Sequence, residues 1–168
     1  DPDRRPTPWK GEDDPYRIWL SEIILQQTRV EQGRPYFEAF VTAYPTVHHL
    51  AAAPQDKVMK KWEGLGYYNR ARNMLAAARY ISDVREGQFP DNYEDILSLK
   101  GVGPYTAAAI ASFAYGLPYA VVDGNVYRVL ARFFGIDQPT NTTAGKKLFT
   151  DLAQTLLAED QPGTYNQA

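Results

Sequence analysis

The sequence contains no cysteine and no long apolar run, and both absences restrict what the protein can be. Without cysteine the 168 residues form no disulfide and supply no thiolate to a metal or cluster, which fits a reducing compartment. The longest uncharged stretch, residues 101–122, is interrupted by glycines and prolines, so it is not one membrane-spanning helix. The first residues, Asp-Pro-Asp-Arg-Arg-Pro, lack the apolar core of a secretion signal.

An excess of basic residues is also lacking, because the net charge is -2. A uniformly basic coat for nucleic acid is therefore excluded, and the distribution of charge matters more than its sum. Residues 57–85 hold seven lysines and arginines against two acids, whereas other acids gather near both ends of the chain. A local basic face and an ordinary solvated helix surface both fit this distribution.

Apolar residues make up 44% of the chain, which is enough for a globular core. Strand signals are poor, and glycines and prolines separate segments with helical spacing, so we predict an all-α fold. Helices are expected over residues 15–28, 35–44, 54–62, 68–85, 92–97, 104–116, 124–134, 143–158 and from 162 onward.

The segment Leu99–Thr106 reads Leu-Lys-Gly-Val-Gly-Pro-Tyr-Thr and predicts a tight turn that enters a helix. Two glycines let the main chain turn sharply and approach another molecule closely. Free N–H groups and the dipole at the following helix N-terminus attract a phosphate, such as one from DNA. The same residues also fit a plain turn between helices without a ligand.

Two carboxylates are candidates for chemistry. Glu22 lies in the apolar segment Trp-Leu-Ser-Glu-Ile-Ile-Leu, where burial raises a carboxyl pKa and keeps a proton available near neutrality. Asp123 precedes a predicted helix and is expected to cap it as an ionised carboxylate. An acid and a carboxylate that meet across a cleft are what glycosidic cleavage requires. A solvated helix face for Glu22 and capping alone for Asp123 remain open from the residues.

Five stretches, in this order along the chain, carry a resemblance to a known family. They are Pro8-Trp9-Lys10, Trp19–Thr28 (WLSEIILQQT), Gly64–Arg72 (GLGYYNRAR), Leu99–Thr106 and Val122–Leu130 (VDGNVYRVL). The chain resembles the helix-hairpin-helix DNA glycosylase superfamily, endonuclease III-like, and within it the adenine glycosylases of the MutY type. This implies two helical lobes with a cleft between them. Residues 15–130 would form a six-helix lobe, and residues 1–14 with 131–168 would form part of a second, cluster-type lobe, truncated at its C-terminus.

The resemblance implies an enzyme of base excision repair that hydrolyses the N-glycosidic bond of adenine mispaired with 8-oxoguanine or guanine in duplex DNA. Glu22 would be the general acid, Asp123 would stabilise or capture the sugar cation, and Tyr105 and Asn125 would support them. The adenine pocket would include Arg5, Trp9 and Gln167. Contacts to DNA and to the opposite base would come from Gln27, Thr28, Leu65, Tyr67, Gly101, Val102 and Gly103.

Tyr105 stands where endonuclease III-type glycosylase-lyases place a lysine that forms a Schiff base, and tyrosine is unsuited to that attack. A monofunctional glycosylase is therefore implied. Two alternatives stay open: an endonuclease III-like glycosylase for another damaged base, and a non-enzymatic helix-hairpin-helix module that only binds DNA.

The resemblance also implies a [4Fe-4S] cluster in the full-length family, although this chain has no cysteine to ligate it and we expect no metal site within it. A bound monovalent cation is implied at the Gly101–Gly103 hairpin. We expect a monomer that works inside the cell with DNA, in the cytoplasm or nucleoid of a bacterium or otherwise in the nucleus or a mitochondrion, and not at a membrane.

Overall fold

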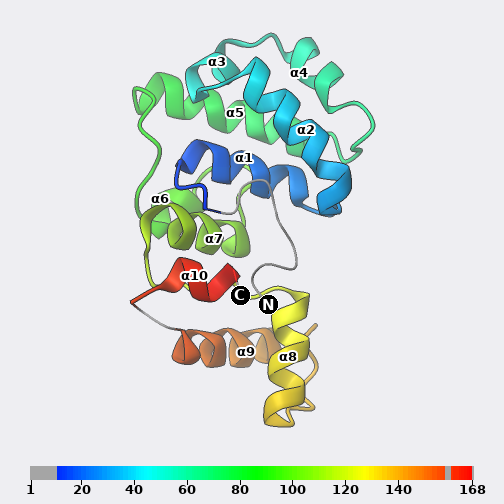
Figure 1. The fold of residues 1–168 in the computed structure, drawn as a ribbon, viewed down its shortest axis with the longest axis vertical. Coiled ribbons are helices and arrows are strands. Elements are labelled where there is room, and N and C mark those ends of the chain that lie inside the picture. The colour runs from blue at the N-terminus through cyan, green and yellow to red at the C-terminus, as the bar shows by residue number, and fades with distance from the viewer. Residues whose placement is uncertain (1–10, 158–159, 168) are drawn as a thin grey trace.

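The structure, a computed structural model, describes residues 11–157 and 160–167, with only the backbone at residue 167. Within these residues the chain is helical and has no strand, which confirms the all-α prediction (Figure 1). No helix in the described ranges has both the length and the apolar character needed to cross a membrane. The helices are α1 Pro15–Leu25, α2 Val30–Ala43, α3 Val47–Ala52, α4 Gln55–Trp62, α5 Asn69–Val84, α6 Tyr93–Leu97, α7 Pro104–Tyr115, α8 Gly124–Phe134, α9 Thr143–Leu156 and α10 Pro162–Gln167.

Local signals set most helix ends. Asp14 caps α1 by accepting a hydrogen bond from the Tyr16 N–H, and Asn92 caps α6 in the same way. α7 and α8 end at Gly116 and Gly135, each in the left-handed conformation that glycine adopts without strain. The prediction for residues 124–134 is therefore confirmed without change.

Two helix predictions need correction, and one helix was missed. α1 ends at Leu25 and not at residue 28, because Gln26 leaves helical geometry. α2 begins at Val30 and contains Pro35, which we had expected to start the helix because proline favours the first turn. Helix α3 was not predicted, since its six residues are too short for a clear apolar period.

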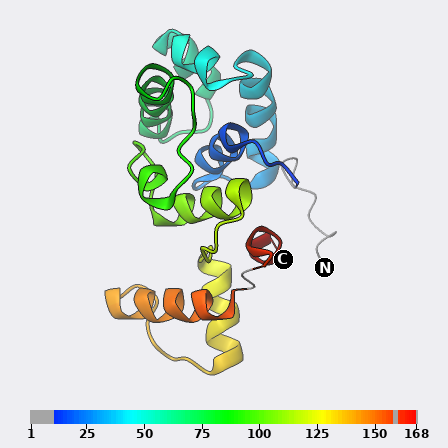
Figure 2. The same cartoon turned by 90° about the vertical axis from the view of Figure 1, so that its left-hand side faces the viewer.

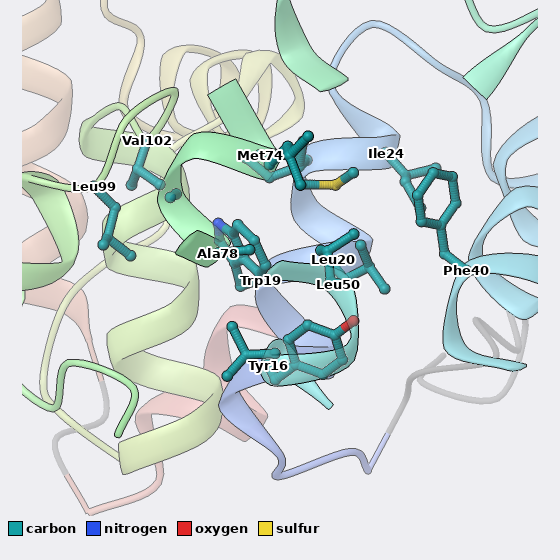
Figure 3. Packing of buried hydrophobic residues seen from close by; sticks show 14 of the residues in the cluster. Tyr16, Trp19, Leu20, Ile24, Phe40, Leu50, Met74, Ala78, Leu99 and Val102 are labelled. Atoms are coloured by element: carbon teal, nitrogen blue, oxygen red, sulfur yellow. The ribbon is translucent and has the colours of Figure 1, made fainter. Parts of the chain in front are cut away.

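The main hydrophobic core lies among α1 to α7 (Figure 3). Trp19 and Leu20 of α1 are fully buried, as are Phe40 of α2 and Met74 of α5. Val102, from the turn before α7, belongs to the same cluster. The hairpin turn is thus anchored to the core by an apolar side chain, which fixes its place beside α1.

α8 and α9 pack together below this body and form a smaller cluster around Leu130, Phe149 and Ala153 (Figures 1 and 2). α10 lies between the two parts and packs against α7. The boundary that we placed at residue 130 falls inside α8, and the division into lobes stays a prediction.

Candidate active site

Tyr105 links the two candidate carboxylates. It is the second residue of α7, and α7 packs directly against α1, which carries Glu22. Burial is the main cause that raises the pKa of the Tyr105 phenol, and the charges of Glu22 and then Asp123 raise it further. Both carboxylates therefore lie close enough to Tyr105 to act on its phenol electrostatically, and their joint role in one site stays a prediction.

Glu22 is held in surroundings that favour its protonated form. It projects from a helix whose neighbouring residues Ser21, Ile23 and Ile24 are buried. Although Glu22 keeps some exposed area, desolvation raises the pKa of its carboxyl to about 7. The group can therefore carry a proton near neutral pH and release it to a substrate. Ser21 does not line this site, since its hydroxyl donates to the Ile18 carbonyl at 2.7 Å.

Asp123 is fixed as the N-cap of α8. Its Oδ1 accepts hydrogen bonds from the N–H groups of Asn125 at 2.8 Å and Val126 at 2.9 Å. Its Oδ2 accepts from the Asn125 amide Nδ2 at 3.1 Å, and Arg128 donates to Asn125 Oδ1. The carboxylate is thus held by main-chain and side-chain donors together, so capping and a role in the site are compatible.

The hairpin before α7 has the predicted geometry. Gly101 has a φ of +83°, and a Cβ there would lie 2.9 Å from the Asn73 Cβ on α5. Gly103 caps α7 without a side-chain hydrogen bond, and the space at its missing Cβ is open. Gln26 reaches across from the end of α1 and donates to Thr106 Oγ1 at 3.3 Å. The hairpin is therefore tied to the helix that carries Glu22.

Beside the hairpin lies a cavity of about 490 Å³. It is lined by Gln26, Gln27, Tyr67, Tyr68, Asn69, Arg70 and Arg72. Gln27 and Tyr67 have φ values of 57° and 47°, and among described non-glycine residues only Glu86 shares this left-handed conformation. Such strain persists where surrounding structure enforces it and often marks a binding site. Tyr67 is 68% exposed at the rim, and the Arg70 guanidinium lies over its ring at 5.8 Å from the ring centre.

Arg70 is a residue whose role the sequence did not reveal. Its guanidinium donates to the carbonyls of Ile24 at 3.0 Å and Gln26, which caps the C-terminus of α1. It also donates to the carbonyls of Leu65 and Gly66, each at 3.3 Å. One side chain therefore joins the end of α1 to the loop that carries Tyr67, and its burial lowers the pKa of the guanidinium.

Replacing Arg70 with methionine is expected to lower the free energy of unfolding by about 3 kcal/mol, because several half-buried carbonyls lose a charged donor. Arg72→Met is the matched control on α5, since Arg72 is exposed and donates to Asn69 Oδ1 one turn away. That change is expected to cost less than about 0.5 kcal/mol. Urea unfolding of both variants measures the difference, and equal losses would contradict the capping role.

Other predicted residues are placed as follows. The Leu65 side chain is buried in the main core, and Thr28 Oγ1 accepts from Arg70 at 3.3 Å. Arg5 and Trp9 lie outside the described residues, as does the side chain of Gln167. None of these placements tests the proposed roles, which stay predictions.

The basic stretch of residues 57–85 is partly used inside the protein. Besides Arg70, Arg79 donates to the carbonyls of Ala51 and Ala53, and Arg85 forms an ion pair with Asp95 at 3.3 Å. These contacts fix the arginines in place, and a basic face for DNA in this stretch stays a prediction.

The residues present do not fit an iron–sulfur cluster. The chain has no cysteine, and the described residues contain no group of three histidines, aspartates or glutamates that could hold a metal ion.

The described fold is an all-α body that carries a glycine hairpin before α7, a glutamate with a raised pKa on α1 and an aspartate that caps α8. Residues 20–153 match the family described as the HhH-GPD superfamily base excision DNA repair protein. The chain belongs to this superfamily of helix-hairpin-helix repair proteins.

Similar proteins agree with this membership. The chain is 37% identical over 165 residues to the adenine DNA glycosylase of Buchnera aphidicola subsp. Baizongia pistaciae, covering 98% of this chain and 46% of that protein. It is 39% identical over 177 residues to the adenine DNA glycosylase of Homo sapiens, covering all of this chain and 32% of that protein. The chain thus spans less than half the length of these curated relatives.

Solved structures show the same fold. A thermostable thymine-DNA glycosylase superposes with a TM-score of 0.88 at 32% identity, covering 98% of this chain and 76% of that one. A non-covalent endonuclease III–DNA complex superposes with a TM-score of 0.77 at 23% identity, covering 91% and 71%. The second likeness concerns the fold alone.

Proposed function

We propose that the protein excises adenine mispaired with 8-oxoguanine or guanine from duplex DNA. The observation that supports this most is the shared influence of Glu22 and Asp123 on Tyr105, since base excision needs an acid and a carboxylate at one site. The adenine glycosylases among the relatives favour adenine as the base. The target nucleotide would be flipped out of the duplex to reach these groups.

In the proposed reaction Glu22 donates its proton to a ring nitrogen of adenine. The N-glycosidic bond then breaks, its electron pair leaves with the base, and positive charge develops on the sugar. The Asp123 carboxylate stabilises that charge, and water adds to the sugar carbon while its proton returns to Glu22. Tyr105 stays protonated because its pKa is raised, so its hydroxyl can donate one hydrogen bond to a carboxylate oxygen of Asp123 or Glu22.

The DNA backbone and opposite strand would be held by neighbouring residues. We propose that the Gly101–Gly103 main chain takes a phosphate, together with a monovalent cation, since the α7 N-terminus above it has no side-chain cap. Gln27 and Tyr67, at the 490 Å³ cavity, would contact the base opposite adenine. The Leu65 side chain is buried, so it would support this loop rather than enter the duplex.

Tyr105 also leads us to propose a monofunctional enzyme, which removes the base without cleaving the strand. Because its substrate is DNA, we propose that the enzyme acts in the compartment that holds the DNA. A phenol with a raised pKa is a poor nucleophile and forms no Schiff base with the sugar. Borohydride should therefore trap no covalent protein–DNA complex during excision. Efficient trapping by the unmutated protein would overturn this part of the proposal.

The rate of excision is expected to depend on the Glu22 proton. Because the pKa of Glu22 is about 7, the second-order rate constant should be level below that pH and fall about tenfold per pH unit above it. Excision rates from about pH 6 to about pH 9 at fixed ionic strength measure this, since DNA binding varies with salt. A level profile up to about pH 9, with unchanged DNA affinity, would contradict the acid role of Glu22.

A glycosylase for another base is the second candidate, because the thymine-DNA glycosylase superposes over nearly the whole chain. A panel of duplexes separates the two: adenine opposite 8-oxoguanine, adenine opposite guanine, thymine opposite guanine, and an oxidised pyrimidine opposite guanine. We expect release from the two adenine mispairs. Release of thymine or the oxidised pyrimidine alone would favour the second candidate, and binding without release of any base would favour a DNA-binding module.

A further inference from the structure

The segment that joins α7 to α8 is held from two sides by amide side chains. Gln154 of α9 donates through Nε2 to the Pro118 carbonyl at 2.6 Å and accepts from the Ala120 N–H at 2.9 Å. Asn166 of α10 donates through Nδ2 to the Tyr119 carbonyl at 2.8 Å and accepts from the Val121 N–H at 3.0 Å. We call these two side chains the amide clamp.

The amide clamp supplies the main-chain hydrogen bonds that two neighbouring strands would give to a strand in a sheet. Successive main-chain groups of an extended segment face opposite directions, so residues 118 and 120 can bond to one side and residues 119 and 121 to the other. Each primary amide offers a donor and an acceptor, which match the carbonyl and N–H of alternate residues. Four consecutive residues are thereby fixed without any strand beside them.

Asp123 follows this segment after one further residue, Val122. Asn166 also donates to Ser112 Oγ at 2.8 Å, and Ser112 is a buried residue of α7, the helix that carries Tyr105. Asn166 therefore bonds on one side to the element that carries Tyr105 and on the other to the segment that leads to Asp123. Gln154 connects the same segment to α9, the helix that packs on α8.

We propose that Gln154 and Asn166 are positioning residues that fix the position of Asp123 relative to Tyr105 and Glu22. This inference rests on the proposed function for its catalytic meaning, whereas the amide clamp itself can be tested without activity. The clamp acts at a distance, through the main chain, and neither amide needs to touch the substrate.

Hydrogen exchange tests the amide clamp directly. Gln154→Met keeps the side-chain length but removes both hydrogen bonds, so exchange of the Ala120 amide should accelerate at least about tenfold while the Val121 amide changes little. Asn166→Leu should give the opposite pattern. Gln161→Met, at an exposed glutamine before α10, is the matched control and should alter neither amide. Unchanged exchange in both variants would overturn the clamp.

Kinetics test the positioning role. At saturating DNA, each clamp variant should lower the single-turnover excision rate about tenfold or more, with DNA affinity changed less than about threefold. In an Asp123→Asn background the same variants should cause little further loss, because the clamp acts through Asp123. A full additional loss in that background, or unchanged rates in the parent, would overturn the proposal.

Two further cases are a clamp variant that does not fold and an unmutated protein that releases no base. If Met or Leu prevents folding, Gln154→Glu and Asn166→Asp keep the acceptor and lose only the donor. The same rate comparison then applies, whereas exchange of the Ala120 and Val121 amides should stay near that of the parent because their acceptors remain. If the unmutated protein releases no base, the proposed function fails and the catalytic meaning of the clamp fails with it. Exchange at Ala120 and Val121 then still shows whether the clamp forms.

Discussion

Replacing Glu22 with glutamine is expected to lower the single-turnover rate of base excision about 1000-fold while DNA binding stays intact. Glutamine has nearly the same shape but no transferable proton, so the leaving adenine departs without protonation. The surroundings that raise the Glu22 pKa to about 7 are what make this carboxyl an acid near neutrality. Quenched single-turnover assays and a binding assay on the same duplex measure the two effects.

The same substitution should stabilise the fold at alkaline pH. The folded protein binds the Glu22 proton more tightly than the unfolded chain, whose carboxyl titrates near its ordinary value of 4.5. Stability is therefore lost as the pH rises from about 4.5 to about 7, and Glu22→Gln avoids a loss on the order of 3 kcal/mol. The melting temperature of the variant should exceed that of the parent at about pH 8 and match it at about pH 4.

Glu38→Gln is the matched control for both measurements, because Glu38 is exposed on α2 and away from the site. It should change neither excision nor the pH dependence of melting. Excision by Glu22→Gln at a rate near that of the parent would remove Glu22 from the mechanism.

Replacing Asp123 with asparagine is expected to slow excision about 100- to 1000-fold with little loss of stability. Asparagine can still accept hydrogen bonds from the N–H groups of Asn125 and Val126, so the cap of α8 is kept. The negative charge that stabilises the developing sugar cation is removed. Single-turnover rates and thermal melting of the same preparation separate the charge from the cap.

Asp14→Asn provides the comparison, since Asp14 caps α1 through the Tyr16 N–H at 3.0 Å and has no place in the proposed reaction. The chemical change and the structural position are the same in both variants. Only Asp123→Asn should lose excision, and a similar loss in Asp14→Asn would mean that capping and not charge controls the rate.

Short-range features of this fold could be predicted from the sequence. Asp123 and Gly135 define both ends of α8, because a capping side chain and a left-handed glycine act within one turn of the helix. Pro104 and Gly116 bound α7 for the same kind of reason. Pro35 misled the prediction of α2, since a proline inside a helix and a proline at its start look alike in sequence.

Long-range features could not be predicted in the same way. Glu22 lies near enough to Tyr105 to raise its pKa because α1 packs on α7, and no local spacing shows which faces of two helices come together. The prediction that Glu22 and Tyr105 share a site came from the resemblance to the helix-hairpin-helix DNA glycosylases. Arg70 and Asn166 act through main-chain carbonyls and N–H groups of distant segments, and such contacts leave no periodic signal in the sequence. The amide clamp and the Arg70 contacts at the C-terminus of α1 therefore emerge only from the structure.

The most direct test of the account is single-turnover release of the free base by the intact protein from two matched duplexes. One contains adenine opposite 8-oxoguanine and the other thymine in place of that adenine, each assayed with the parent and with Glu22→Gln. We predict that the parent releases adenine from the first duplex only and that Glu22→Gln releases none at the same level of binding. Equal release by the parent and the variant, or no release of adenine by a parent that binds the duplex, would contradict an adenine glycosylase that works through Glu22.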